Sequence, residues 1–410
     1  MKTVLMHQTS IPRLWEIWMT GERFLASVTG MTSNSSKRGS FFIIASRSDI
    51  IFSSKRRMQV QRDPSGYWKM AHDPSCLEEK IISDLEAIMK KDPLLEEFDV
   101  IPVTEAKNRS PVIHISHNLG IEVWCIKTVF MYCYENSFKL EPLWKKEYLR
   151  LERYTKAALL LNANITTLWN IRKRLITNHF LGVDCDFLLT KLVLSQKPKC
   201  FEALSHRRWL LQQASSSNPH WVETELSLCD RLSSRMKCNY HAWSHRQCVF
   251  SQAIKQQGFS LTTWASEFEV SDVWTKCHLS DHSGWHYRKF LLDQFRKNLD
   301  NIEQHMDVAR KLWSNATGTT TSTQLYMELL NEELQKNEDL ILSFNAHETL
   351  WYYRRFLLQA GTINHSENLF LEKCRNSNQS NCKKAAATNF DGVQMRYIEH
   401  HRRWLSDFCL

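Results

Sequence analysis

The densest group of residues that could do chemistry is the run from Ser280 to His286, which reads Ser-Asp-His-Ser-Gly-Trp-His. A serine, a carboxylate and an imidazole are the components of a hydrolytic nucleophile system. The run shows no signature of the strained turn that exposes such a serine, and Asp281 stands where it would cap a helix carrying Trp285. We therefore expect a structural role for this run.

Metal and nucleotide chemistry find no support in the remaining motifs. The twelve cysteines form neither a Cys-x-x-Cys pair nor a Cys/His spacing typical of zinc. Several of them, such as Cys125, Cys229 and Cys248, lie among apolar residues, where cysteine acts as a small core side chain. No phosphate-binding glycine loop and no paired carboxylates are seen. We expect reduced thiols, a cytoplasmic protein, no metal or cofactor in this chain, and a scaffold without catalytic residues of its own.

One pattern recurs along the chain: a large apolar residue, here called the anchor, is followed three residues later by arginine. The copies are Trp169 and Arg172, Leu204 and Arg207, Trp243 and Arg246, Trp285 and Arg288, Trp351 and Arg354, and a degenerate copy from Glu399 to Arg402. Positions i and i+3 share one helical face. We expect each anchor to fill the groove between the two helices of its repeat, and each arginine to reach carbonyls or a carboxylate in the adjacent repeat. Five copies cannot all be an active site, so the motif is predicted to be structural.

Histidines recur with this motif, at His206, His245, His286 and one of His400 and His401. Recurrence with a structural motif favours hydrogen-bonding core residues over metal ligands.

The anchors lie 35, 39, 42 and 66 residues apart, and the first three intervals fit the period of helix-pair solenoids. Asn239 and Asp281 are placed as caps of helices that carry Trp243 and Trp285. Only eleven glycines and nine prolines interrupt the chain. The predicted fold is all-α, a right-handed α-α superhelix of helical hairpins. The predicted repeats cover about 142–180, 183–215, 221–257, 260–297 and 324–360, with a degenerate last copy at about 392–408.

Residues 1–69 differ from the rest of the chain. They hold eleven Lys and Arg against four acidic residues, a net charge of +7 that leaves only +2 of the total +9 for residues 70–410. A basic groove for nucleic acid is therefore not expected on the repeat domain. The segment is predicted to be a disordered basic extension or a gene-model artefact with Met70 as an alternative start; a functional extension is the other possibility.

Some features outside the repeats are also predicted. The apolar spacing of Ile81, Leu85 and Met89 predicts a helix, and a second helix is predicted over 119–134. The Ser/Thr-rich patch 317–323 is predicted to be a loop, and 362–391 a mobile insertion. No apolar run reaches the ~18 residues that a membrane-spanning helix needs.

The segment Asn239-Tyr-His-Ala-Trp-Ser-His-Arg246 resembles the repeat of protein prenyltransferase alpha subunits. The blocks 108–111, 270–272 and 280–284 resemble the branch of alpha subunit repeat-containing proteins rather than the farnesyltransferase or Rab geranylgeranyltransferase alpha chains. The resemblance implies a helical crescent around a beta subunit that holds zinc and the isoprenoid diphosphate. Such a heterodimer transfers farnesyl or geranylgeranyl to a cysteine of an acceptor protein.

In farnesyltransferase-like alpha chains, a lysine just before the Asn-Tyr-His-Ala-Trp segment assists the diphosphate. Cys238 occupies that position here, with Lys237 one residue earlier, so the position lacks the positive charge of the family lysine. The resemblance makes Tyr240 a candidate for the substrate channel. Two functions remain open: the alpha subunit of a prenyltransferase, inactive alone, or a helical-repeat adaptor that binds a protein partner without chemistry.

Overall fold

The computed structural model describes residues 61–62, 68–69, 76–106, 108–213, 220–312, 321–361, 367–382 and 389–408. The basic extension 1–69 lies outside these residues, apart from an antiparallel pair of two-residue strands, β1 (Gln61–Arg62) and β2 (Trp68–Lys69). Met70, the candidate alternative start, also lies outside them.

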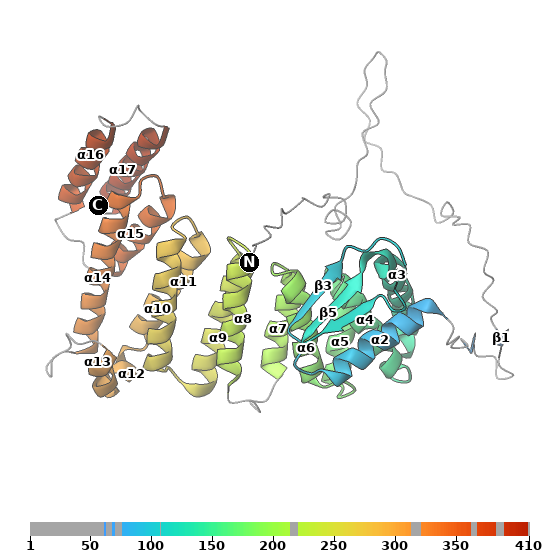
Figure 1. The fold of residues 1–410 in the computed structure, drawn as a ribbon. Coiled ribbons are helices and arrows are strands. Elements are labelled where there is room, and N and C mark those ends of the chain that lie inside the picture. The colour runs from blue at the N-terminus through green and yellow to red at the C-terminus, as the bar shows by residue number, and fades with distance from the viewer. Residues whose placement is uncertain are drawn as a thin grey trace, which may run out of the picture.

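Helical hairpins stacked side by side make up most of the described chain (Figure 1). The first helix of each hairpin is called here the A helix, and the second, which carries the repeat motif, the B helix. The hairpins are α4 (Tyr148–Leu161) with α5 (Thr166–Thr177), α6 (Val183–Gln196) with α7 (Phe201–Gln213), α8 (Trp221–Arg235) with α9 (Tyr240–Gln257), α10 (Leu261–Cys277) with α11 (His282–Lys297), α14 (Ser322–Ser343) with α15 (Glu348–Ala360), and α16 (Glu367–Cys382) with α17 (Asn389–Phe408). The predicted α-α superhelix is confirmed.

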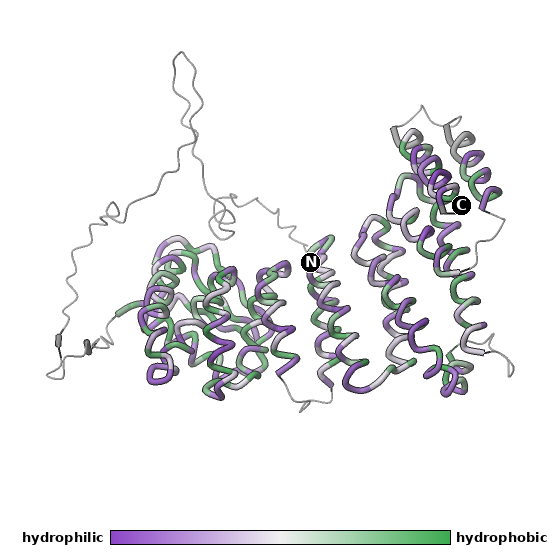
Figure 2. Tube along the Cα trace, turned by 180° about the vertical axis from the view of Figure 1, so that it is seen from behind, coloured by the Kyte–Doolittle hydropathy of each residue, from purple (hydrophilic) through white to green (hydrophobic). Residues whose placement is uncertain are grey.

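Side-chain caps fix where several helices begin. The Asn239 side chain accepts a hydrogen bond from the Ala242 amide at 3.2 Å, and Asp281 accepts one from the Ser283 amide at 3.0 Å. Thr321 forms a capping box at the start of α14. Each bond satisfies an amide that the helix itself leaves without a partner. Hydrophilic and hydrophobic residues alternate along these helices, as expected for amphipathic helices packed on their neighbours (Figure 2).

A three-stranded sheet at the N-terminal end of the superhelix is a feature that sequence reasoning missed. Its order is β3 (Glu97–Ile101), β5 (Asn118–Glu122) and β4 (Val112–Ile115), with β3 parallel and β4 antiparallel to the central β5. The preceding helix α2 (Leu77–Lys91) buries the predicted stripe against this region. The helix predicted over 119–134 was wrong at its start, because α3 covers Val123–Leu140. The short 3-10 helix η1 (Glu141–Leu143) then leads to α4.

Two short helices contribute to the long fourth interval between anchors. These helices, α12 (Leu299–Gln304) and α13 (Met306–Leu312), are inserted between α11 and α14. Of the predicted loop 317–323, residues 317–320 lie outside the described chain, while Ser322 already begins α14. The predicted insertion 362–391 is largely helical, because α16 occupies its middle.

The buried apolar side chains fall into three groups along the superhelix. One group runs from α2 to the start of α9, and another from Trp243 towards the C-terminus. A small group of five residues, which includes Leu226 and Val249, lies between them. Beside it a cleft of about 350 Å³ opens among α8, α9 and α10. The apolar core is therefore least continuous at the third and fourth hairpins.

Candidate functional site

The arginines of the repeat motif are buried in ion pairs that join successive hairpins. Each arginine on a B helix donates to a carboxylate on the A helix of the next hairpin. The pairs, called here the ion-pair series, are Arg172–Asp186, Arg207–Glu225, Arg246–Glu267, Arg288–Glu333 and Arg354–Glu367. In the second pair, Nε and Nη2 of Arg207 lie 2.7 Å from the two oxygens of Glu225. This two-point contact is what a planar guanidinium can hold.

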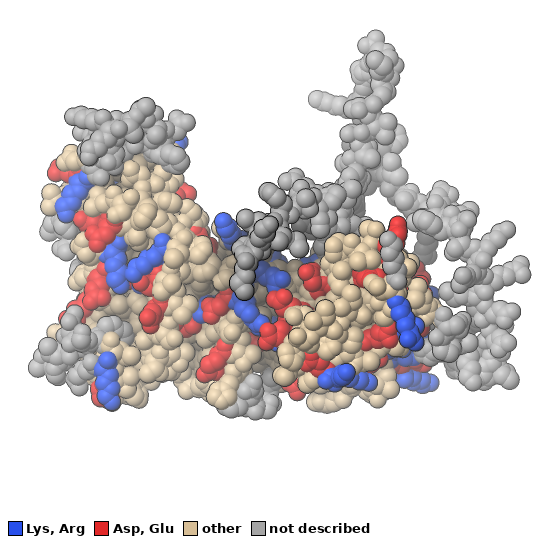
Figure 3. All heavy atoms as spheres, viewed as in Figure 1, with Lys and Arg blue, Asp and Glu red and all other residues tan. Residues whose placement is uncertain are grey.

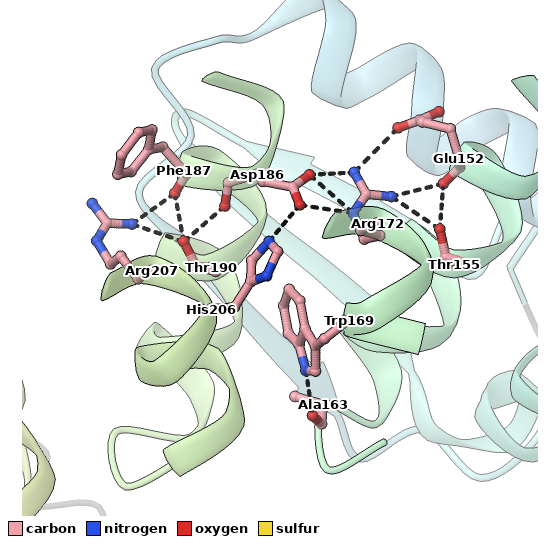
Figure 4. Close-up of polar contacts among 10 residues, drawn as sticks. All are labelled: Glu152, Thr155, Ala163, Trp169, Arg172, Asp186, Phe187, Thr190, His206 and Arg207. Carbon is pink, nitrogen blue, oxygen red and sulfur yellow. Dashed lines mark hydrogen bonds and ion pairs between the residues drawn. The ribbon is translucent and has the colours of Figure 1, made fainter. Parts of the chain in front are cut away.

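The remaining donors of these arginines bind the A helix of their own hairpin. Nη1 of Arg172 donates to the Glu152 carbonyl at 2.9 Å and to Thr155 Oγ1 at 3.1 Å (Figure 4). Arg207 and Arg288 repeat this arrangement, with Thr190 and Ser271 as the hydroxyl partners. Each arginine thus ties its own two helices to the following hairpin.

A third side chain completes each unit of the ion-pair series. The residue just before the next motif arginine binds the same carboxylate. These residues are His206, His245, Tyr287, Tyr353 and His401, at 2.6, 3.0, 2.5, 2.8 and 2.9 Å from a carboxylate oxygen. Figure 4 shows His206 and Arg172 meeting at Asp186 from two different helices.

Two of the predicted core histidines do not take part. His286 is exposed, because Tyr287 takes the equivalent position, and His400 is exposed beside the buried His401. The prediction of a core role was therefore wrong for His286 and right for His206 and His245.

The electrostatics of the series favour charged carboxylates and neutral imidazoles. Burial raises the pKa of Glu225, but the charge of Arg207 and the hydrogen bonds from His245 and Arg207 outweigh it and lower the pKa to about 2. Burial lowers the pKa of His206, His245 and His401 despite the neighbouring carboxylates. Their Nδ1 atoms are buried and have no hydrogen-bond partner, so a proton there would be poorly stabilised.

The anchors are buried, but they pack differently from the prediction. Each tryptophan anchor lies against the His or Tyr of the next hairpin rather than only between its own two helices. The ring centroids are 4.6 Å apart for Trp169 and His206, 5.4 Å for Trp243 and Tyr287, 4.8 Å for Trp285 and Tyr353, and 5.3 Å for Trp351 and His401. Leu204, the aliphatic anchor, is fully buried as well. Anchor and arginine therefore act together at each hairpin junction.

The run Ser280 to His286 is structural in its geometry. Asp281 caps α11 and also accepts a hydrogen bond from Nε1 of Trp274 at 2.9 Å. Gly284 lies so close to Trp274 that a Cβ there would approach its ring at 2.6 Å. Oγ of Ser280 lies 2.8 Å from Nδ1 of His347. The Asp281 carboxylate binds Ser283 and Trp274 instead of acting as a base for Ser280.

The residues before α9 form an exposed edge. Tyr240, the first residue of α9, is 65% exposed, and Cys238 is exposed with a positive φ of 53°. Lys237 precedes it and is also exposed. The side-chain Nδ2 of Asn239 donates to the Pro198 carbonyl at 2.8 Å, so the loops before α7 and α9 are held together.

The same edge continues onto the preceding hairpin, and here a residue was missed. Lys199 stands two residues before the start of α7, as Cys238 stands two residues before α9, and it is exposed. The rings of Phe201 and His241 lie 5.6 Å apart between these two loops. Lys199 and Arg208 both help to lower the pKa of His241, after burial as the main cause. The edge therefore keeps positive charge one hairpin away from Cys238.

The protein prenyltransferase alpha subunit repeat matches residues 183–214, 222–253, 264–295 and 330–361. The chain is 33% identical over 309 residues to protein prenyltransferase alpha subunit repeat-containing protein 1 of Danio rerio. The matched region covers 68% of this chain and 71% of the Danio rerio protein. The Homo sapiens protein of the same description is 32% identical over 320 residues, 70% and 78% of the two chains. The chain belongs to the protein prenyltransferase alpha subunit repeat family.

A more distant relative is the geranylgeranyl transferase type-2 subunit alpha of Bos taurus, 26% identical over 206 residues, which is 48% of this chain and 31% of that one. The four matched prenyltransferase alpha subunit repeats correspond to the hairpins from α6 to α15. The ion-pair series extends the repeat structure by one hairpin in each direction, through Arg172 on α5 and Glu367 on α16.

Within the described residues of this family member, no group of three His, Cys, Asp or Glu side chains could hold a metal ion. None of the helices in the described ranges is long and apolar enough to cross a membrane.

The carboxylates of the ion-pair series are buried charged residues that sequence reasoning missed. They lie 13 to 45 residues after their arginines, and this variable spacing does not allow them to be predicted from the sequence.

Proposed function

We propose that the chain is the alpha subunit of a heterodimeric protein prenyltransferase and acts as its scaffold. The partner is a beta subunit that binds zinc and the isoprenoid diphosphate. Together they transfer farnesyl or geranylgeranyl from the diphosphate to a cysteine of an acceptor protein in the cytoplasm. The relation to the geranylgeranyl transferase type-2 alpha subunit supports this proposal.

The observation that carries the scaffold role is the use of the buried polar groups. The strongly perturbed carboxylates and histidines of the repeats are paired with each other in the ion-pair series. Groups held this way stabilise hairpin junctions and are not available for proton transfer to a substrate. The chemistry is therefore assigned to the partner, and the chain alone should be inactive.

The exposed edge before α7 and α9 is the part of this chain that we place nearest the substrate. Tyr240 and Phe201 offer apolar surface, and Lys199 supplies positive charge that Cys238 cannot. A cation at Lys199 suits stabilisation of a departing diphosphate. Lys199→Ala should then lower the rate of transfer without weakening the subunit complex.

The second candidate is an adaptor that binds a protein partner without chemistry. The replacement of the family lysine by Cys238, which cannot supply a positive charge, favours it.

One experiment separates the two functions. The full chain is co-expressed with the beta subunits of farnesyltransferase and of the geranylgeranyltransferases, purified by an affinity tag and tested for transfer of labelled isoprenoid. A stoichiometric complex that labels a cysteine acceptor, but not its Cys→Ser variant, is the expected result. A stable complex without transfer would favour the adaptor, and transfer by the isolated chain would refute the scaffold role.

A further inference from the structure

The outward faces of the B helices carry a second repeated pattern, which the ion-pair series does not use. Counting from each anchor, the fourth residue is basic in four of the five hairpins, and the fifth is often aromatic. The basic residues are Lys173, Arg208, Lys289 and Arg355, with Gln247 in the third hairpin, and the aromatic residues are Trp209, Phe290, Phe356 and Trp404. These eight charged and aromatic side chains are called here the cation–aromatic stripe.

Contacts between hairpins join the stripe in two stretches, one on each side of the third hairpin, where Gln247 and Cys248 interrupt it. Nζ of Lys173 lies 5.7 Å from the ring centroid of Trp209 on the next B helix, and Nζ of Lys289 lies 4.8 Å from that of Phe356. The guanidinium of Arg355 lies 5.8 Å from the ring of Trp404 in the same way. The same contact therefore recurs at three junctions, which places these side chains along one face of the superhelix.

The cations of the stripe have no carboxylate partner among the described residues. Two of them follow directly after arginines of the ion-pair series, which allows a comparison within the chain. Arg207 and Arg354 are buried and fully paired, whereas Arg208 and Arg355 form no ion pair, and their Nε atoms are buried without a hydrogen-bond partner. Burial lowers the pKa of Arg355. A partly desolvated cation that forms no ion pair is unfavourable unless a partner supplies a carboxylate.

Carboxylates occur on the same B helices, among them Glu202, Asp293, Glu348 and Glu399, but none forms an ion pair with a stripe cation in the described chain; Glu348 offsets only part of the effect of burial on the pKa of Arg355. In Figure 3 basic side chains gather over α11 and α15, with acidic side chains in separate places nearby. Arginine and half-buried aromatic side chains are enriched at the centres of protein interfaces.

We propose that the cation–aromatic stripe is the docking surface for an acidic face of the prenyltransferase beta subunit. This inference rests on the proposed function and names the contact that holds the two chains together. Carboxylates of the partner would pair with Arg208 and Arg355, and its apolar side chains would cover the aromatic residues between them.

Charge density favours a protein partner over nucleic acid. Neighbouring B helices lie about 8–10 Å apart, so the stripe offers at most one cation for each such step, and none at Gln247. Duplex DNA carries one phosphate charge per about 1.7 Å, and proteins that bind it place several basic residues over that length. Half-buried rings that lie beneath the cations are also not free to stack on bases.

The test uses the full chain with Arg208→Glu and Arg355→Glu combined, and a milder Arg208→Gln and Arg355→Gln version that keeps most of each side chain. The matched control combines Arg231→Glu on the A helix α8 with Lys127→Glu on α3, two exposed residues outside the stripe. Affinity for the beta subunits of farnesyltransferase and the geranylgeranyltransferases is measured at 50 and 300 mM NaCl. A thermal melt checks that every variant folds.

Charge reversal is expected to weaken binding roughly 10- to 100-fold and to reduce its dependence on salt, with the Gln version intermediate and the control unchanged. Unchanged affinity of the folded reversal variant would overturn the docking surface and leave the proposed function intact. If the wild-type chain binds none of the beta subunits, both proposals fail together. Binding of a single-stranded RNA or of phosphatidylserine vesicles through these arginines, with no beta-subunit binding, would also overturn the inference.

Discussion

Replacement of Glu225 by glutamine should be the most damaging single change in the ion-pair series. Glutamine has nearly the same shape, so the substitution removes the charge and little else. It leaves the guanidinium of Arg207 buried, with its remaining bonds to the Phe187 carbonyl and Thr190 Oγ1 at 2.9 and 2.8 Å. Removal of one partner of a buried ion pair typically costs about 3–5 kcal/mol.

The comparison with Asp186→Asn makes the expectation specific to this structure. Arg172 keeps a second carboxylate when Asp186 is neutralised, because its Nη2 lies 3.6 Å from Glu152. Arg246, Arg288 and Arg354 also have a second carboxylate within 4 Å, whereas no second one lies near Arg207 in the described chain. We therefore expect Glu225→Gln to cost about 4 kcal/mol and Asp186→Asn about 2 kcal/mol.

Urea unfolding followed by circular dichroism measures both variants, and hydrogen exchange of α7 and α8 locates the loss. Repeat proteins need not unfold in one step, so the local measurement guards against an averaged midpoint. The combined variant Arg207→Met with Glu225→Met is the control, and it should recover most of the stability because no buried charge remains. An equal or larger loss for Asp186→Asn would show that the second carboxylate is not what protects Arg172.

Three further outcomes are expected. Stability should fall in two stages on acidification. The pKa values of His206, His245 and His401 are lowered on folding, so the stability that these residues contribute is complete above about pH 6.5 and is lost below it. The pKa of Glu225 falls from 4.5 to about 2 on folding, so its protonation adds a loss of about 3 kcal/mol between pH 5 and 2. Urea midpoints measured across this pH range test both stages, and a flat profile from pH 7 to 5 would contradict the first. Trp243→Ala should destabilise the protein by about 3–5 kcal/mol. Trp243→Phe should cost less than Trp169→Phe, because Nε1 of Trp169 donates to the Ala163 carbonyl at 2.8 Å while Nε1 of Trp243 has no partner. Thermal melts that show the reverse order would disprove the role of this hydrogen bond. Gly284→Ala should cost about 1–3 kcal/mol because its Cβ would meet Trp274, whereas Gly392→Ala, with open space around it, should not destabilise; equal melting temperatures would count against the close approach.

The repeats could be predicted from the sequence because the motif residues and the helix cap lie close together along the chain. Trp243 and Arg246 are three residues apart on one helix, and Asn239 before them is a strong capping residue, so the helix start and its buried face can both be read locally. The ion-pair partners are different. Glu267 and Glu333 reach their arginines only through the stacking of hairpins, and the inserted α12 and α13 change the separation in sequence from 21 to 45 residues.

The small sheet was missed for another reason. Its strands are four or five residues long, and the apolar residues of β5 run directly into those of α3. A short apolar run next to a helix has no period that separates the two. The sheet is set by tertiary contacts instead, such as the bond from the Phe98 amide to Ser195 Oγ on α6 at 2.8 Å. The edge residue Lys199 was missed because the family pattern drew attention to Cys238 one hairpin later.

The way each carboxylate is shared has a consequence for how such a chain can grow or shrink. An A helix supplies the acid for the arginine before it, and the B helix of the same hairpin supplies both the His or Tyr for that acid and the arginine for the next one. Each period therefore contains one carboxylate, the His or Tyr that binds it, and the arginine that binds the next carboxylate. If the hairpin α6–α7 were deleted as a whole, Arg172 would face Glu225 in place of Asp186, and His245 would still complete the site. Gain or loss of one whole period leaves no buried charge without a partner, whereas loss of a single helix, such as α8 with Glu225, leaves a motif arginine or its carboxylate unpaired.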